Sequence, residues 1–312
     1  MVCYEPPEQL TPGELGTLVD NKPDLRDITA TLVDLAVRGY VRIEEQEHKV
    51  LLWTKHDYLF RLLKPPAQWD ELKEHERELL LGLFHTSDTA GADVKLSELQ
   101  NHFYAYLPGI RGAIFKELIK KGFYARNPEN VKSLYVALGV GVLAVSMVGL
   151  LILASRTGAS SLTAILAAAS TGLIIILFGL IMPARTLRGA QTRIALLGFE
   201  EFLSRAEKDH IDRLQGHPEL FDKYLPYAMA LGVERKWTHA FENIYLQPPN
   251  WYQGTYASGF RPVLLLNSLN AFNHQAFSTM VSSPRSSSSG SSGFGGGGFS
   301  GGGFGGGGGG AF

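Results

Sequence analysis

The stretch TATLVDLAVRGYVRIEE, residues Thr29–Glu45, predicts a helix that ends at Gly39 and runs directly into a strand. Apolar residues recur at helical spacing before the glycine, and apolar and polar residues alternate after it. Glycine adopts the left-handed backbone that ends many helices. The order of helix, glycine, aromatic residue and strand is typical of the recognition helix and wing of a winged helix-turn-helix.

A second stretch, AIFKELIKKGFYARN at Ala113–Asn127, has the same order. When the two are aligned on Gly39 and Gly122, the apolar face and the terminal basic residue recur together. The equivalent pairs are Leu32 and Phe115, Leu35 and Leu118, Ala36 and Ile119, Arg38 and Lys121, and Tyr40 and Phe123. We therefore expect two winged-helix-like units in tandem, at residues 1–64 and 65–132.

Two uncharged stretches of 21 residues, 134–154 and 162–182, follow the second unit. Each is long enough to cross a hydrocarbon core of about 30 Å at about 1.5 Å per residue. Both are apolar on all sides, whereas the core helices of soluble domains usually keep a polar face. The seven-residue connection SRTGASS leaves room only for a tight return, so residues 133–184 are predicted to form an antiparallel transmembrane hairpin.

Basic residues flank both stretches, while the connection between them carries Arg156 alone. The membrane-orienting flanks are Lys120, Lys121, Arg126, Lys132, Arg185, Arg188 and Arg193. By the positive-inside rule, both large flanking regions are cytoplasmic and the chain is a multi-pass protein of the cell (inner or plasma) membrane. No Asp, Glu, Lys, Arg or His occurs within 134–154 or 162–182, which favours an anchor over a proton relay or pore.

Small residues at four-residue spacing in the two stretches allow helices to approach closely. The candidate packing residues are Ala137, Gly141, Ala164, Ala168 and Gly172. They predict packing within the hairpin or between copies in a homo-oligomer.

After the hairpin, residues 185–252 have the pattern of an all-α cytoplasmic domain, in which Trp237, Phe241 and Ile244 share one core face. Residues 253–281 are expected to be a linker. From residue 282 to 312 the chain is almost entirely serine and glycine with isolated phenylalanines, and such a composition predicts a disordered tail. The tail is interpreted as an inert flexible end or, alternatively, as an aromatic segment that self-associates.

The charge of the N-terminal region disfavours nucleic acid as a partner. Residues 1–132 hold 17 basic and 21 acidic side chains, a net charge of −4. Asp24, Asp27 and Asp34 are expected on the exposed face of the first candidate recognition helix, where they would repel a duplex.

No catalytic, metal or cofactor site is predicted. The nine histidines form no HExxH pair, Cys3 is the only cysteine, and neither a GxSxG nor a GxxxxGK[ST] motif occurs. The acidic run EHERE at Glu74–Glu78 is interpreted as a solvated helix face. We therefore expect no enzyme and no cofactor.

Several distinctive sequence segments occur in the order found in one known family. They are YEPPEQLTPGELGTLVD (4–20), DITATLVDLAVRGYVRIEE (27–45), LPYAMALGVERKW (225–237), PPNWY (248–252) and the glycine-rich end. Together they resemble the C-terminal part of the YciQ-like predicted prokaryotic membrane protein family (domain of unknown function 2207). The resemblance implies a bacterial or archaeal membrane protein and carries no established site residues. Members usually also have a signal, an extracytoplasmic β-rich domain and a further span before the YEPP motif. This chain begins three residues before that motif, so we expect a truncated member or a fragment.

These observations predict an α+β membrane protein that serves as a membrane-anchored cytoplasmic interaction or scaffold protein. Its expected partners are the lipid bilayer and an unidentified cytoplasmic protein. Two alternatives stay open, a membrane-tethered winged-helix transcription regulator and an oligomeric transport or pore component.

Overall fold

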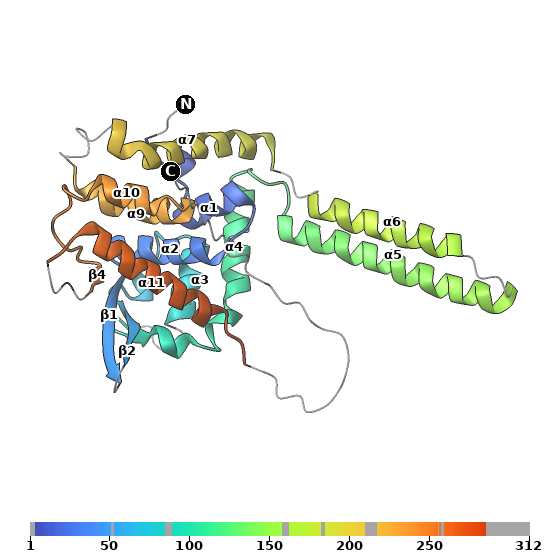
Figure 1. Ribbon diagram of the computed structural model, residues 1–312, viewed down its shortest axis with the longest axis horizontal. Helices are drawn as coiled ribbons and strands as arrows, with labels where there is room; N and C mark the ends of the chain where they lie inside the picture. The colour runs from blue at the N-terminus through green and yellow to red at the C-terminus, as the bar shows by residue number, and fades with distance from the viewer. Residues whose placement is uncertain are drawn as a thin grey trace, which may run out of the picture.

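The computed structural model describes residues 4–50, 53–84, 89–157, 162–181, 185–209, 217–254, 256 and 259–284. These residues form a body of helices and a small sheet, from which two long helices project to one side (Figure 1). The fold is therefore mixed α and β, as the sequence predicts.

The first two helices each begin at a capping box. In α1 (Pro12–Asp20) the Thr11 amide donates to Glu14 Oε2 at 2.9 Å, and the Glu14 amide donates back to Thr11 Oγ1 at 3.4 Å. In α2 (Leu25–Val37) Asp24 and Asp27 exchange the same two bonds at 3.2 Å. Each box satisfies two amides that the first turn leaves without partners, which fixes where the helix starts.

A four-stranded sheet has the order β3-β2-β1-β4. Strands β1 (Val41–Val50) and β2 (Trp53–Leu62) form an antiparallel hairpin. The edge strand β3 (Asp93–Lys95) is antiparallel to β2, and β4 (Tyr252–Gln253) is parallel to β1. The last of these strands comes from far along the chain, so the sheet joins the two ends of the sequence.

Helices α3 (Glu74–Leu83) and α4 (Leu107–Lys120) pack against each other and against the first pair. Short 3₁₀ helices connect these elements, and they are η1 (Pro7–Gln9), η2 (Pro66–Gln68), η3 (Leu96–Leu99) and η4 (Phe103–Ala105).

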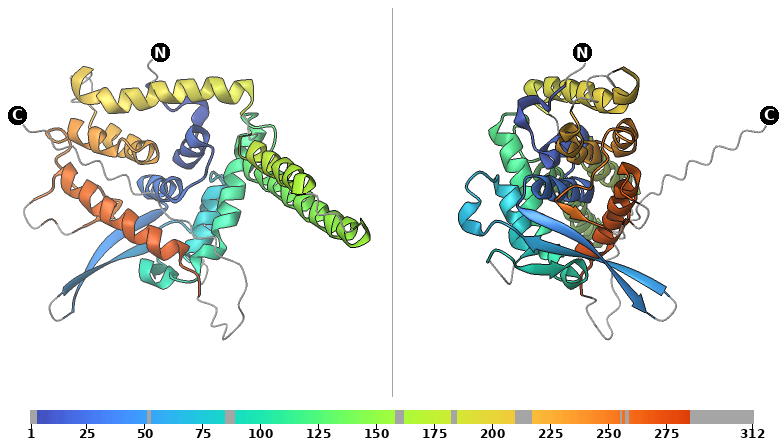
Figure 2. Two further views of the ribbon diagram at one scale, coloured as in Figure 1. Left: turned by 45° about the vertical axis from the view of Figure 1, so that its right-hand side comes forward. Right: turned by 90° about the vertical axis from the view of Figure 1, so that its left-hand side faces the viewer.

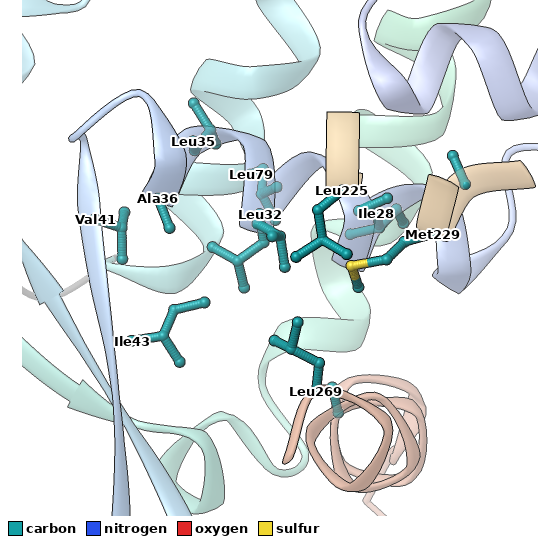
Figure 3. Packing of buried hydrophobic residues seen from close by; sticks show 14 of the residues in the cluster. Ile28, Leu32, Leu35, Ala36, Val41, Ile43, Leu79, Leu225, Met229 and Leu269 are labelled. Atoms are coloured by element: carbon teal, nitrogen blue, oxygen red, sulfur yellow. The ribbon is translucent and has the colours of Figure 1, made fainter. Parts of the chain in front are cut away.

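Helix α2 lies at the centre of the body, and every residue from Asp27 to Ala36 is buried. Figure 3 shows its apolar side chains meeting Leu225 and Met229 of α9 (Glu219–Leu231), Leu269 of α11 (Pro262–Val281) and the first residues of β1. Helix α10 (Glu234–Ala240) packs against α9 and α11. A single hydrophobic cluster runs from Leu10 to Met280, so the body shares one core.

The two projecting helices are α5 (Pro128–Thr157) and α6 (Leu162–Ile181). They lie side by side in every view and extend away from the body (Figure 1 and Figure 2). Helix α7 (Leu187–Asp209) then returns across the body and packs against α1 and α10. We call α5 and α6 the helix pair, and its root is the place where they leave and rejoin the body.

Among the described residues, one stretch, Pro128–Leu150 of α5, is long and apolar enough to cross a membrane. Only 6% of its most apolar part is buried, unlike a core helix of a soluble protein. Within α6, Ala169–Ile181 forms a shorter apolar helical segment.

The structure corrects the linker expected at 253–281. Residues Pro262–Val281 form α11, a helix in which Leu265, Leu269, Phe272, Ala276 and Met280 recur at helical spacing and are buried. Phe272 packs edge to face on Tyr58 and Phe60 of β2, with ring centroids 5.2 and 5.9 Å away. Nor are the helices after the helix pair a separate unit, because α9 packs on α1 and α2.

The expectation that Asp27 and Asp34 face solvent is wrong. Their exposed fractions are 0% and 7%. Asp27 is covered by α1, where its carboxylate lies against Gly16 and accepts from Thr17 Oγ1 at 3.4 Å, and Asp34 pairs with Arg38 beside the buried Glu76 of α3. Most of the predicted disordered tail, residues 285–312, lies outside the described residues.

Candidate functional site at the root of the helix pair

The two helix–glycine junctions have nearly the same backbone geometry. Gly39 has φ +76° and Gly122 has φ +79°, a conformation that costs glycine little. At the first, the Gly39 and Tyr40 amides donate to Ala36 and Leu35 carbonyls, both at 2.9 Å. At the second, the amides of Gly122 and Phe123 donate to the carbonyls of Ile119 and Leu118 at 2.8 and 3.0 Å. Both helices therefore end in the same Schellman motif.

The chain also leaves both junctions in the same way. After the first, Val41 pairs with Leu62, and the Leu63 amide donates to the Tyr40 carbonyl at 2.9 Å. After the second, Tyr124 forms an antiparallel bridge with Arg185, and the Thr186 amide donates to the Phe123 carbonyl at 3.0 Å. The helix pair thus leaves and rejoins the second junction where the β1–β2 hairpin leaves and rejoins the first.

Each junction follows a pair of helices, α1–α2 or α3–α4, and the first helix of each pair begins in the same way. Glu14 in the first turn of α1 accepts from the Thr11 amide, and Glu76 in the first turn of α3 accepts from the Lys73 amide at 2.8 Å. Both glutamates are buried, with exposed fractions of 0% and 1%.

Ion pairs connect each helix start to the opposite junction. Arg38, beside Gly39, places Nη1 2.6 Å from Glu76 Oε1. Lys121, beside Gly122, places Nζ 3.2 Å from Glu14 Oε2. Lys73 adds a second cation 2.6 Å from the same Glu14 oxygen. The two exchanges are reciprocal, so they hold α1–α2 and α3–α4 together as a pair.

Burial and charge set the protonation of this ionic network. Burial alone would raise the pKa of Glu14, but Lys73 and Lys121 outweigh it and hold that pKa below its ordinary value. Burial raises the pKa of Asp34 to about 6, although Arg38 lies 3.0 Å away and opposes the shift. Burial also lowers the pKa of His75, whose Nε2 lies 3.1 Å from Thr11 Oγ1.

Two of the predicted membrane-orienting arginines fasten the root to α1. Arg185 donates to the carbonyls of Leu18 at 2.9 Å and Val19 at 2.8 Å, and Arg193 donates to Val19 at 3.1 Å. These carbonyls lie in the last turn of α1, where the helix dipole favours a cation. The arginines therefore tie the return from α6 to the first helix of the body.

The other orienting residues divide into paired and unpaired groups. Lys121 belongs to the ionic network, Arg188 lies 3.0 Å from Glu8, and the largely exposed Lys120 lies 3.7 Å from Glu117. Arg126 and Lys132 are exposed and make no ion pair among the described residues.

The candidate packing residues also divide. Gly172 lies in the contact between α5 and α6, where an added Cβ would meet Leu143 Cγ at 2.4 Å. Gly139 and Gly179, which were not singled out, are equally close to the opposite helix. Ala137 and Gly141 lie on an exposed face of α5. The side chains of Ala164 and Ala168 are outside the described set, and the homo-oligomer stays a prediction.

Sequence reasoning missed the carboxylates of the network. The EHERE run was interpreted as a solvated face, yet His75 and Glu76 within it are buried. A signal was present, because Glu76 stands three residues after Lys73, at the position that closes a capping box.

The arrangement is suited to fastening segments of the chain to one another. Among the described residues, no group of three or more His, Cys, Asp or Glu side chains could hold a metal ion. The buried glutamates of the network are each neutralised by Arg or Lys at 2.6 to 3.2 Å. Such pairs hold segments in fixed register.

Comparison with known proteins supplies the family. The model for the C-terminal domain of a predicted membrane protein, DUF2207, matches residues 3–241, which includes both junctions and the helix pair. No curated protein and no solved structure matches the chain. The resemblance noted in the sequence is therefore confirmed, and the chain belongs to the DUF2207 family of predicted membrane proteins.

Proposed function

We propose that this protein is a membrane-anchored interaction protein, in which the helix pair crosses the bilayer and the body docks a protein partner in the cytoplasm. The observation that carries the proposal is the apolar surface of the helix pair. Its exposed large side chains are Leu134, Leu138, Val140, Val145, Met147, Val148 and Ile152 on α5 and Leu173, Ile174, Leu177, Phe178, Leu180 and Ile181 on α6. Soluble proteins rarely expose an apolar patch of this extent, whereas lipid would cover it.

The connections within the body support a particular number of crossings. Arg185 and Arg193, which follow α6, bind carbonyls of α1, which precedes α5. Phe202 of α7 likewise packs on Tyr4, with ring centroids 5.2 Å apart. Segments before and after the helix pair thus share one body, which supports an even number of crossings. The basic flanks then favour the cytoplasmic side.

The body itself supports a tandem of winged-helix-like units. In this interpretation α2 and α4 are the equivalent recognition helices, the β1–β2 hairpin is the wing of the first unit, and the helix pair replaces the wing of the second. The matched Schellman motifs at Gly39 and Gly122 and the matched returns at Leu63 and Thr186 support the equivalence.

The same geometry disfavours a DNA reader. A recognition helix must present a free face to base edges in the major groove. Helix α2 has none, because α9 and α11 cover it. An interaction with protein at the outer surface of the body is the better supported use of the fold.

In-cell photo-crosslinking tests this function. A benzophenone amino acid would replace Leu81, Leu246 or Phe277, which expose 48%, 68% and 56% of their surface on the body. The matched control is Val145 on α5, which is 75% exposed and expected to face lipid. We expect a discrete protein adduct from at least one body position. The absence of any discrete adduct from all three body positions would contradict the proposal.

A further inference from the structure

A cleft of about 450 Å³ lies at the root of the helix pair, between the α1–α2 turn and the ends of α5 and α6. One wall is the turn Asp20–Asp24, and the others come from Arg111 of α4, Glu129 and Lys132 of α5, and Leu180 of α6. Three helices and a turn that are distant in sequence therefore converge on it.

Three cations in this cleft lack partners. Among the described residues, the side chains of Lys22, Arg111 and Lys132 make no ion pair or hydrogen bond, and Arg111 Nε is buried without an acceptor. A buried guanidinium nitrogen with no partner carries a desolvation cost that a ligand oxygen would remove. Other cations near the root already have partners, including Lys116 with Glu74 and Arg188 with Glu8.

The carboxylates of the lining are mostly engaged. Asp20 accepts from the Lys22 amide at 3.0 Å and lies 3.9 Å from Arg26. Asp24 caps α2 and lies 4.0 Å from Arg26. The lining holds three cations and three carboxylates, and Arg26, which is shared by Asp20 and Asp24, brings the total to four cations against three carboxylates, a net charge of +1. The three cations of the lining carry this excess without partners, an arrangement that suits an anion.

The position of the cleft indicates which anion. Lys132 stands two residues before the first predicted span, and Leu180 lies two residues before the end of the second. Both therefore lie at headgroup depth if the helix pair crosses the bilayer. A soluble anion would gain nothing from the leucine, whereas an acyl chain would pack along it.

Resting on the proposed membrane anchoring, we propose that this cleft binds an anionic phospholipid of the cytoplasmic leaflet. The phosphate lies among Lys22, Arg111 and Lys132, and one acyl chain runs along Leu180. Basic pockets beside the cytoplasmic ends of transmembrane helices commonly recognise anionic headgroups in this way.

The test is retention of phosphatidylglycerol against phosphatidylcholine by the full chain, measured by native mass spectrometry from detergent micelles. We expect the wild-type chain to retain phosphatidylglycerol preferentially. Arg111→Gln, Lys22→Gln and Lys132→Gln should each weaken retention about fivefold, since each removes one cation near the headgroup. Arg126→Gln removes the same charge from an exposed flank outside the cleft and should leave retention unchanged.

Three results would overturn the inference: equal retention of the two lipids, equal losses in the cleft variants and in Arg126→Gln, or displacement of the lipid by excess inorganic phosphate. The last would assign the cleft to a soluble anion. Lys132 is exposed, so Lys132→Gln keeps the test decisive if Arg111→Gln fails to fold.

Reconstitution into nanodiscs separates the two proposals. A chain that inserts but shows no lipid preference refutes only this inference, and one that does not insert refutes the anchoring as well.

Discussion

The Nη1 atom of Arg38, which ends α2, lies 2.6 Å from Oε1 of Glu76, which stands in the first turn of α3. Its counterpart is the contact of Lys121, which ends α4, with Glu14 in the first turn of α1. Each glutamate closes a helix start, and each cation precedes a glycine with positive φ. The exchange joins the segment that carries the β-hairpin to the segment that carries the helix pair.

Removing one member of such a pair should cost far more than removing an exposed charge. Arg38→Met would leave Glu76, which is 1% exposed, and Asp34 without their cation, and we expect the free energy of unfolding to fall by about 3 kcal/mol. The control is Lys120→Met, whose side chain is 76% exposed and should contribute less than about 1 kcal/mol. Chemical denaturation of the full chain in detergent measures both. Equal losses would show that the network does not stabilise the body.

The raised pKa of Asp34 predicts a specific pH dependence. Its value is about 6 in the folded chain against 3.8 for the ordinary group, so the folded state holds the proton more tightly. The stability that Asp34 contributes is therefore present at low pH and is lost as pH rises through about 4 to 6. Asp34→Asn cannot titrate, so the wild type should lose stability relative to this variant over that range. Melting temperatures of the wild type and Asp34→Asn measured at several pH values test this prediction. A difference between the two melting temperatures that does not change with pH would contradict it.

Contact between α5 and α6 should depend on glycines that face each other. A Cβ at Gly139 would lie 2.4 Å from Ile176 Cγ1, whereas a Cβ at Gly141 would meet nothing within 4 Å. Gly139→Val should destabilise the helix pair by about 1–3 kcal/mol, and Gly141→Val should have little effect on the isolated chain. Thermal unfolding in detergent compares the two. If Gly141→Val destabilised the chain more than Gly139→Val, the contact face would instead be the one that residue spacing alone predicts.

Helix α11 lies beyond the family match yet should be required for the fold. Phe272 is fully buried against Tyr58 and Phe60, so Phe272→Ala should cost about 3–5 kcal/mol. Phe277 on the same helix is 56% exposed, and Phe277→Ala should change stability by less than about 0.5 kcal/mol. Limited proteolysis that cuts residues 262–281 equally in wild type and both variants would show that α11 is not held on the body.

The local elements could be predicted from sequence because their signals are local. The capping box at Thr11, the stop at Gly39 and the stop at Gly122 each depend on residues within one or two turns. The repeat of the helix–glycine–aromatic motif could also be recognised in the sequence, since equivalent positions around Gly39 and Gly122 carry similar side chains.

The surroundings of those elements could not be predicted in the same way. Asp27 and Asp34 look exposed on an isolated helix, but packing of α2 against its neighbours buries them, Asp27 against Gly16 and Thr17 of α1 and Asp34 beside Arg38 and Glu76. Arg185 and Arg193 carry the charge expected of membrane flanks, but their hydrogen bonds go to carbonyls more than 160 residues earlier in the chain. Helical periodicity does not report such long-range partners, so the root of the helix pair emerged only from the structure.

The central claim, that the helix pair crosses the membrane and the whole body stays on one side, is tested most directly by single-cysteine labelling in intact spheroplasts. In a Cys3→Ser background, cysteines would be placed at Ser155 at the far end of α5, at Glu71 before the pair and at Lys236 after it, all of them exposed positions. We predict that a membrane-impermeant maleimide labels Ser155→Cys in intact spheroplasts, and labels Glu71→Cys and Lys236→Cys only after permeabilisation. Labelling of either body position before permeabilisation, or protection of Ser155→Cys, would contradict the account.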